Sequence, residues 1–357
     1  MKSSYKIKVL ITVSSLQIGG EQRVVSILTD NFVRLGIDVT IFVLTSKQDK
    51  QFCFNPRVNI IYGNTQSLKF KNIRRITMLR KLIKEEHFDV VVGFAMIPSV
   101  LCAIAARDIC PSIVTERNDP GIYSCKMKLL RYFAYHLCSA GIFQTNSAAD
   151  YFPYIQNKKV IPNPINIELL PEPYIGVRNK RIVNTSRLVP EKNQKMLIIA
   201  FAELHEKYPE YTLAFYGDGV ERENLIELSR ELGIAEKVQV SPATKDILKV
   251  IQKDSVFVLT SNHEGFPNSL AEALAIGIPS ISTDCRIGGP NDMIEHNVNG
   301  KLIPVGDAER LVVELDELMG SLEMQEIFSH NSIKLREELS ADKISEIWFD
   351  AMKSIIR

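Results

Sequence analysis

The sequence has 357 residues, which at about 150 residues per domain predicts two domains. Hydrophobic residues make up 45% and charged residues 24%, a balance that excludes a disordered, collagen-like or coiled-coil chain. The net charge is only +1, so no nucleic-acid partner is expected. No run approaches the roughly 18 apolar residues of a membrane span.

The near-zero net charge conceals two halves of opposite sign. Residues 1–165 carry 22 Lys and Arg against 11 Asp and Glu, a net of +11. The remaining residues carry 21 basic against 31 acidic side chains, a net of −10. This asymmetry predicts an anionic partner for the first half.

The start of the chain is basic and then apolar, which is also the pattern of a signal peptide. Its apolar run is short, alternates as a strand does and leads into Gly19 and Gly20, so we interpret it as a first β-strand. The six cysteines form no CxxC pair, which is typical of reduced thiols. These features predict a cytosolic protein.

Short β-branched runs alternate with amphipathic stretches through the first half. The alternation predicts a parallel sheet with helices on both faces. The expected strands are 7–13, 38–44, 90–94, 112–115 and 141–144, and the expected helices are 21–35, 72–86, 99–107 and 126–138.

The pattern restarts after a break at Pro164, Pro171 and Pro173. The second series has strands at 181–184, 211–216, 237–240, 255–260 and 279–282, with helices at 194–207, 220–232, 245–252 and 268–276. We therefore expect two Rossmann-like, doubly wound α/β domains. The first spans 1–164 together with a covering helix in 342–357, and the second spans 165–341. Ligands of such sheets bind at the carboxyl ends of the strands, here in a cleft between the domains.

Three constellations in loops after predicted strands indicate chemistry. Gly19 and Gly20 stand between the first strand and the first helix, where a backbone can approach a phosphate. A plain tight turn explains them equally well. The pair is not GxGxxG, which counts against a nicotinamide site.

The second constellation follows the first strand of the second series. Ser186 and Arg187 begin a loop in which Lys192 comes five residues after Arg187. Two cations in a loop that enters a helix can clamp a pyrophosphate. The alternative is a solvated basic loop.

The third constellation runs from Glu264 to Glu272 after the apolar strand 255–260. Glu272 stands among small apolar residues of a helix, and a buried carboxylate needs partners. We therefore expect one carboxylate to hold a sugar and the other a ribose diol. Between them the segment of Gly265, Phe266, Pro267, Asn268 and Ser269 leads into a helix start, where backbone N–H groups other than that of Pro267, which has none, are presented.

These motifs resemble a GT-B glycosyltransferase of the retaining family 4, the group that builds bacterial lipopolysaccharide, capsule and lipid-linked glycans. The resemblance covers nearly the whole chain in family order, and the Glu-x7-Glu motif is its specific part. The matching segments are 19–23, 163–164, 186–193, 216–219, 264–272, 289–290 and 299–300.

The resemblance implies roles at the matching positions. Arg187 and Lys192 bind the donor pyrophosphate, Glu264 holds the donor sugar, and Glu272 binds the ribose. Gly20 contacts phosphate through its backbone. The further implied substrate-binding residues are Gly19, Ser186, Gly217, Pro242 beside the base, and the segment from Gly265 to Ser269. The donor is a nucleotide-diphosphate sugar, most simply UDP-linked.

Because the sequence contains no Asp-x-Asp triplet, we expect no divalent metal and no other cofactor. One departure concerns the first half. Many family members carry a His near the reacting carbon, and residues 93–98 contain none. The next strand ends in a polar cluster that contains Glu116 and Arg117, which we expect to face the cleft. They bind acceptor or donor, or they serve in a structural ion pair.

A basic amphipathic stretch occupies residues 66–84 without a single acid. A second, at 126–133, repeats the pattern. Such stretches are typical of anionic membrane surfaces, and the alternative is a helix with a core face and a solvated face. We expect a peripheral protein on the cytosolic face of the inner membrane, with a lipid-linked saccharide as acceptor. The alternative functions are a nucleotide-sugar-binding scaffold and a sugar-nucleotide epimerase on the same fold.

Overall fold

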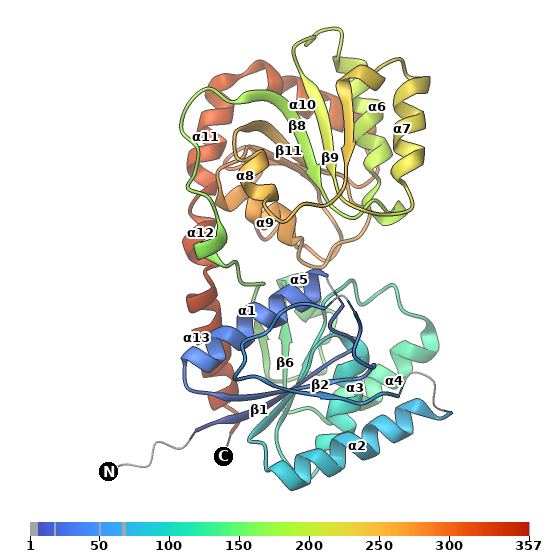
Figure 1. Cartoon of the computed structure of the whole chain (residues 1–357), viewed down its shortest axis with the longest axis vertical. Coiled ribbons are helices and arrows are strands. Elements are labelled where there is room, and N and C mark those ends of the chain that lie inside the picture. Colours follow the sequence, from blue (N-terminus) through green and yellow to red (C-terminus); the bar gives the residue numbers. More distant parts are fainter. Residues whose placement is uncertain (1–5, 18, 50, 66–68, 357) are drawn as a thin grey trace. The chain divides into compact units, whose positions relative to one another are not determined.

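The computed structural model describes residues 6–17, 19–49, 51–65 and 69–356. The chain divides into two compact units, Met1–Pro164 with Ala341–Arg357, and Ile165–Ser340. Each unit contains one parallel sheet with helices on both faces (Figure 1). The predicted fold class, two doubly wound parallel α/β domains, is confirmed.

The sheet of the first unit has seven parallel strands in the order β3-β2-β1-β4-β5-β6-β7. Its central strands are almost wholly buried because both faces are covered, so their sequences are continuous apolar runs. The strands are β1 (Lys8–Val13), β2 (Asp38–Val43), β3 (Asn59–Tyr62), β4 (Val90–Gly93), β5 (Ser112–Thr115), β6 (Ala140–Phe143) and β7 (Lys158–Val160).

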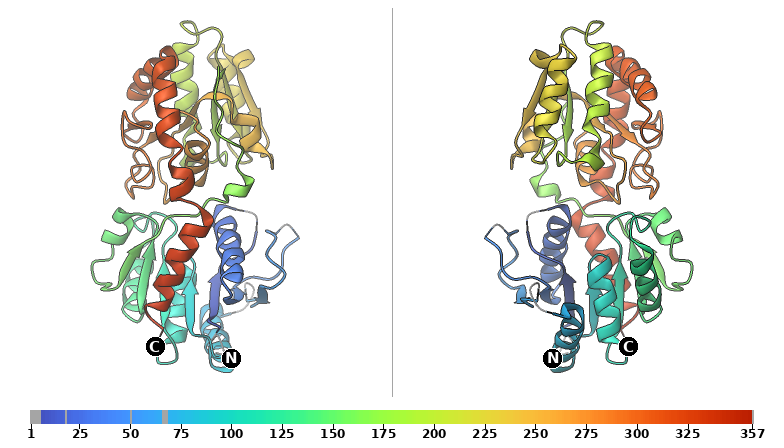
Figure 2. Two further views of the ribbon diagram at one scale, coloured as in Figure 1. Left: turned by 90° about the vertical axis from the view of Figure 1, so that its left-hand side faces the viewer. Right: turned by 90° about the vertical axis from the view of Figure 1, so that its right-hand side faces the viewer.

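Two helices far apart in the sequence cover one face of this sheet. They are α1 (Gly20–Arg34) and α13 (Ala341–Lys353), which lie side by side in both views of Figure 2. Trp348 of α13 packs with Phe32 and Phe94, each at a ring-centroid distance of 6.5 Å. The chain end is therefore part of the first unit's core. The other helices are α2 (Lys71–Glu86) and α3 (Met96–Ala106) on the opposite face, with α4 (Cys125–Tyr135) and α5 (Asn146–Asp150).

The sheet of the second unit has six parallel strands in the order β10-β9-β8-β11-β12-β13. The strands are β8 (Asn179–Thr185), β9 (Thr212–Tyr216), β10 (Val238–Ser241), β11 (Asp254–Leu259), β12 (Ser280–Thr283) and β13 (Lys301–Ile303). One face packs on α6 (Gln194–Leu204), α7 (Arg222–Glu231) and α10 (Ala308–Gly320), and the other packs on α8 (Ile247–Ile251), α9 (Asn268–Ala275) and α12 (Leu335–Glu338). Helix α11 (Leu322–Ser332) and the 3-10 helices Ile167–Leu169, Pro190–Lys192 and Ala235–Lys237 complete the unit.

Each sheet has a point at which the direction of strand addition reverses. It lies between β1 and β4 in the first unit and between β8 and β11 in the second. Loops leave the two adjacent strands in opposite directions there, which opens a crevice at their carboxyl ends. None of the helices within the described ranges combines the length and apolar composition needed to cross a membrane.

Candidate functional site

In the second unit, the two loops predicted to carry chemistry leave the strands at the reversal point. Lys192 follows β8 and Glu264 follows β11. The Lys192 ammonium donates to Oε1 of Glu264, and the Ser261 hydroxyl donates to the same oxygen at 2.7 Å. Both charged side chains are mostly buried, 16% and 10% exposed. The structure thus brings two of the three predicted catalytic residues into direct contact.

Backbone contacts hold these two loops together. The Thr260 hydroxyl donates to the carbonyl of Lys192 at 3.1 Å and to that of Asn193 at 3.0 Å. The N–H of Asn262 donates to the carbonyl of Glu191 at 2.8 Å. The two loops that carry the ion pair are therefore held together by hydrogen bonds and do not move independently.

Gln194 is a site residue that the sequence reasoning missed. Its buried side-chain amide donates to the Arg187 carbonyl at 2.8 Å and to the Ser186 hydroxyl at 2.9 Å. It fixes the turn from which the exposed Arg187 side chain extends. Gly217 allows its own backbone to lie close to that of Ser186. A Cβ atom at position 217 would lie 1.9 Å from the Ser186 carbonyl oxygen.

In the Glu264–Glu272 segment, the backbone rather than the apolar side chains faces the site. Phe266 is buried in the core, and the helix α9 begins at Asn268, with Pro267 before it. The N–H groups of that first turn have no carbonyl partner within the helix itself. Glu272 is 7% exposed within α9. Pro242 is exposed just after β10, at the carboxyl edge of the same sheet.

In the first unit, Gly19 precedes α1 and Gly20 is its first residue, and the following Glu21 interacts electrostatically with Arg117. Burial raises the pKa of the Glu21 carboxyl to about 7, against the opposing attraction of Arg117. Burial likewise lowers the pKa of Arg117 to about 9. The Arg117 guanidinium lies 3.8 Å from the centre of the Phe94 ring and donates to Oδ1 of Asn163 at 3.1 Å.

Glu116 points away from Arg117 and belongs to the interior of the first unit. It is 1% exposed and accepts hydrogen bonds from Arg131 at 3.1 Å and from the Tyr135 hydroxyl at 3.0 Å. Successive residues at a strand end face opposite sides, which separates these neighbours. We expected Glu116 to face a cleft with Arg117; the structure instead gives Glu116 the structural ion pair, with Arg131 as its partner.

The arrangement in the second unit suits an anionic, hydroxylated ligand. Lys192 and Arg187 supply positive charge, α9 supplies N–H groups, and Glu264 and Glu272 can accept hydrogen bonds from hydroxyls. Within the described part of the chain, no three His, Cys, Asp or Glu side chains are grouped to hold a metal ion. A phosphorylated sugar combines the negative charge and the hydroxyls that this arrangement suits.

Comparison with known proteins agrees with this description. The family model "Glycosyltransferase Family 4" matches residues 18–169, and "Glycosyl transferases group 1" matches residues 171–335. The lipopolysaccharide 1,6-galactosyltransferase of Salmonella typhimurium is 29% identical over 84% of this chain and 86% of its own. The amylovoran biosynthesis glycosyltransferase AmsD of Erwinia amylovora is 23% identical over 98% of this chain and 99% of its own.

Solved structures share the fold along the whole chain. The lipopolysaccharide outer core galactosyltransferase WaaB superposes with a TM-score of 0.79 at 20% identity, covering 97% of this chain and 99% of WaaB. HepE of Anabaena, in complex with UDP-glucose, gives 0.78 at 18% identity, covering 98% of this chain and 100% of HepE. The protein is a glycosyltransferase with the GT-B fold. It belongs to glycosyltransferase family 4.

Proposed function

We propose that the protein is a retaining glycosyltransferase that takes a hexose or N-acetylhexosamine from a UDP-linked sugar. It transfers this sugar to a hydroxyl of a lipid-linked saccharide in the synthesis of lipopolysaccharide or exopolysaccharide. The observation that carries the proposal is the pairing of Lys192 with Glu264 at the reversal point of the second sheet. At that point a cation that can bind the donor phosphates lies beside a carboxylate that can bind the donor sugar.

The positive charges of the site explain how the donor sugar can be released from its nucleoside diphosphate. Departure of a nucleoside diphosphate leaves negative charge on a phosphate oxygen, which preorganised cations and N–H groups stabilise. Lys192, Arg187 and the start of α9 supply both, so the proposed reaction needs no divalent metal. HepE, which shares the fold, has been solved in complex with UDP-glucose, and this supports a uridine donor.

Retention of configuration requires attack from the face that the phosphate leaves. The bond from the sugar's anomeric carbon to the phosphate oxygen breaks as the acceptor oxygen bonds to that carbon. The departing phosphate oxygen accepts the acceptor's proton, so no separate protein base is needed. Arg187 and Lys192 then hold the diphosphate product.

The acceptor reaches the enzyme at a membrane surface. In the first unit, α2 and the residue before it expose Phe70 (79%) and Ile73 (65%), and α4 exposes Leu129 (58%) and Phe133 (62%). Lys71, Arg74 and Lys81 are exposed on the same helix as Ile73. Apolar side chains among cations bind the interface of an anionic bilayer. We place the enzyme at the cytosolic face of the inner membrane.

Not every cation of this stretch is available to lipid. Arg75 is buried and donates to the Thr65 hydroxyl at 2.6 Å, and Arg80 donates to the Arg107 carbonyl at 2.9 Å. Residues 66–68 lie outside the described residues. The proposed membrane surface therefore consists of Phe70, Lys71, Ile73, Arg74 and Lys81 on α2 and its start, with Leu129 and Phe133 on α4.

A thermal unfolding screen of UDP-, GDP- and ADP-sugars tests the donor assignment. A UDP-sugar at about 100 times its Kd stabilises the protein by about 2.7 kcal/mol and raises its Tm. Arg187→Ala and Glu264→Ala should then abolish transfer, and near-normal turnover by either variant contradicts the proposal. Binding without transfer or donor hydrolysis identifies a scaffold, and interconversion of the donor without acceptor identifies an epimerase.

A further inference from the structure

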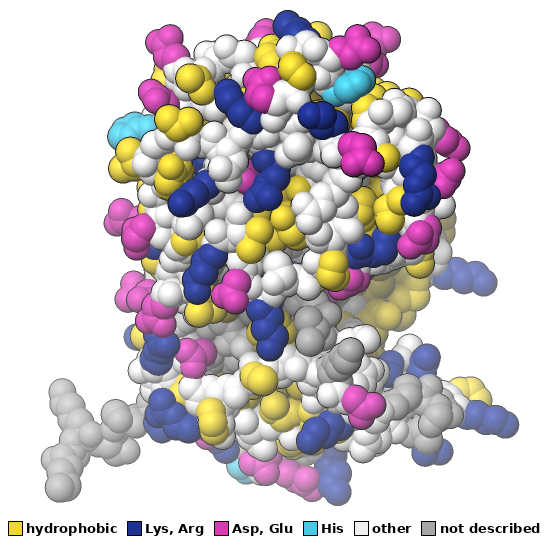
Figure 3. Space-filling model, turned by 45° about the horizontal axis from the view of Figure 1, so that its top comes forward, with side chains coloured by type: hydrophobic (Ala, Val, Ile, Leu, Met, Phe, Trp, Pro, Cys, Tyr) yellow, Lys and Arg dark blue, Asp and Glu magenta, His cyan; other side chains and the backbone are white. Residues whose placement is uncertain are grey.

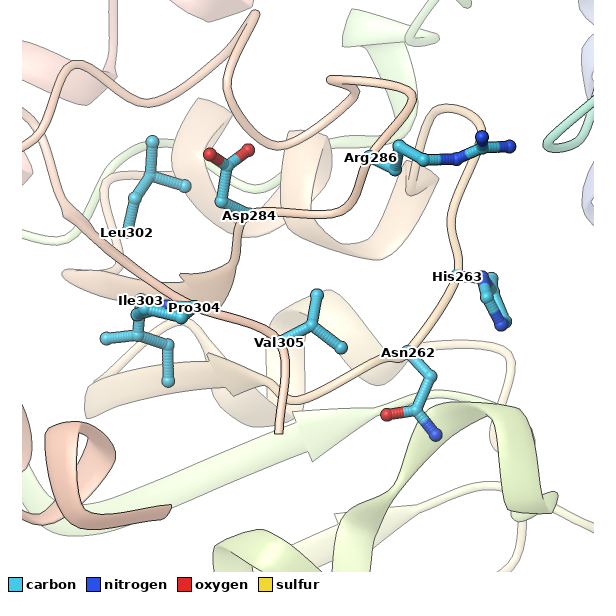
Figure 4. Close-up of a pocket in the computed structure, with 8 residues that line it drawn as sticks. All are labelled: Asn262, His263, Asp284, Arg286, Leu302, Ile303, Pro304 and Val305. Carbon is cyan, nitrogen blue, oxygen red and sulfur yellow. The ribbon is translucent and has the colours of Figure 1, made fainter. Parts of the chain in front are cut away.

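A pocket of about 640 Å³ lies beside the Glu264 loop in the second unit, and the donor roles given above do not use it. The ends of three adjacent strands form it: Asn262 and His263 follow β11, Asp284 and Arg286 follow β12, and the segment 302–305 spans the end of β13 (Figure 4). Its volume lies within the range of small-molecule sites. The pocket therefore has room for a sugar ring.

The pocket and the Glu264 loop share one rigid wall. The Thr283 hydroxyl donates to the Ser261 carbonyl at 2.7 Å, and the Cys285 thiol donates to the same carbonyl at 3.3 Å. Ser261 in turn bonds Glu264. On the other side of the loop, a Cβ on Gly289 would lie 2.1 Å from the Gly265 carbonyl oxygen, so the two loops interlock there as well.

The charges of this pocket differ from those around Lys192. Asp284 and Arg286, two residues apart and both exposed, contribute opposite charges. The pair gives no net attraction for a phosphate. A carboxylate only accepts hydrogen bonds and a guanidinium only donates them, whereas a hydroxyl does both. Asp284 and Arg286 point in different directions in Figure 4, so different hydroxyls of one neutral sugar would bond the two side chains.

The other residues that line the pocket can pack against the apolar face of a sugar ring. Leu302, Ile303, Pro304 and Val305 form an apolar side, and Asn262 adds an amide that donates and accepts. In Figure 4, Val305 lies between Asn262 and Asp284, and Arg286 and His263 extend toward one side of the pocket. Carbon–hydrogen faces of a pyranose are apolar while its rim is polar, which matches this division.

We propose that this pocket is a saccharide subsite that binds a neutral pyranose through Asp284, Arg286 and Asn262. The inference rests on the proposed glycosyltransferase function and deepens it. Because Glu264 is already assigned to the donor sugar, the pyranose expected here is one of the acceptor saccharide. The subsite would then contribute to the choice of acceptor.

Saturation-transfer NMR on the full chain tests the subsite with methyl α-D-glucopyranoside and methyl α-D-galactopyranoside as probes. Saturation transfer to at least one glycoside is expected in the wild type with UDP present. Asp284→Asn and Arg286→Ala should each weaken it about fivefold, the effect of losing a hydrogen bond of ordinary strength. Asp246→Asn and Arg230→Ala, exposed positions elsewhere in the unit, serve as matched controls and should change nothing.

A second arm replaces UDP with intact UDP-glucose and with UDP-galactose. Saturation transfer that persists beside the intact donor assigns the subsite to the acceptor, and displacement by the donor sugar assigns it to the donor. Equal transfer in the wild type and in both pocket variants overturns the subsite, as does absence of transfer in the wild type. The UDP-induced rise in Tm, measured on the same samples, reports the donor site separately, so its loss contradicts the proposed function instead.

Discussion

Lys192 bonds the carboxylate of Glu264, a residue 72 positions further along the chain. The contact joins the loop after β8 to the loop after β11 and holds two opposite charges in a mostly buried place. In the proposed reaction, arrival of the donor phosphates gives the ammonium a second anionic partner. Glu264 then has hydrogen-bonding capacity for the sugar hydroxyls, so one ion pair would contact both the phosphates and the sugar of the donor.

Removal of Lys192 should cost catalysis more than stability. Lys192→Ala deletes a cation that stabilises the leaving diphosphate, and kcat is expected to fall about 100- to 1,000-fold. Ser261 still bonds Glu264, and both side chains of the pair keep some contact with solvent, so the Tm should fall less than it does on loss of the fully buried Glu116–Arg131 pair. Steady-state kinetics with the best donor of the screen measures the loss. Lys249→Ala, at an exposed position, is the matched control, and a similar loss in both variants would refute a specific role for Lys192.

The Glu116–Arg131 pair should behave in the opposite way. Arg131→Met leaves a buried carboxylate without its cation, which costs about 3–5 kcal/mol in the free energy of unfolding. Donor protection against heat should remain, because the pair lies in the other unit. Urea unfolding measures the first effect. Lys207→Met, which breaks the exposed pair with Asp316, should change the free energy of unfolding far less than Arg131→Met does. Loss of donor binding by Arg131→Met without loss of stability would assign the pair to the site.

The sequence predicted the central strands and the edge strand β10, and it left the other three edge strands unassigned. Strands β3, β7 and β13 were not among the predicted strands, and each lies at an edge of its sheet. These three strands contain only three or four residues each, and β3 and β7 are only partly buried, so they lack the long apolar run that marks a central parallel strand. β7, for example, contains only three residues, of which Lys158 and Lys159 are two.

Site residues were predictable where a motif determines the backbone. The loop after β8 and the Glu264–Glu272 segment carry such motifs, and the structure places both at the reversal point. Gln194 and the partner of Glu116 were not predictable, because side-chain contacts between distant segments leave no local pattern. A buried Gln at the start of an apolar helix was the one available signal.

Chelation should leave transfer intact. Since Arg187, Lys192 and the start of α9 supply the charge stabilisation, we expect equal initial rates with and without EDTA after exhaustive dialysis. The measurement is release of the nucleoside diphosphate in the presence of acceptor. Loss of turnover on chelation that Mn²⁺ restores would show that a divalent ion carries part of this charge.

Membrane binding should depend on the exposed cations of α2. The charge reversals Lys71→Glu, Arg74→Glu and Lys81→Glu each remove about 1 kcal/mol of attraction to an anionic surface. Together they should lower co-sedimentation with phosphatidylglycerol-containing vesicles at least tenfold.

Arg75 and Arg80 stay unchanged in this experiment because their contacts support the fold. The control is a triple reversal at Lys245, Lys249 and Lys253, which are exposed in the second unit, whose net charge is negative. Figure 3 shows charges of both signs interspersed over the face that it presents. Unchanged sedimentation of the α2 variant would contradict the membrane proposal.

Glu21 should make stability depend on pH. Its pKa is about 7 in the folded protein against 4.5 for the free side chain. Between these values the folded state holds a proton that the unfolded state has lost, so the free energy of unfolding falls as pH rises and levels off above about 7. Glu21→Gln removes this contribution.

Urea unfolding at several pH values from about 5 to about 8 measures the difference between the wild type and Glu21→Gln. The wild type should lose stability relative to the variant across that window. Glu116, whose pKa is also raised to about 7, contributes equally to both proteins and cancels. Glu346→Gln, on the exposed side of α13, is the control and should show a constant difference. A constant difference for Glu21→Gln as well would mean that Arg117 keeps the Glu21 carboxylate ionised throughout, as a permanent ion pair.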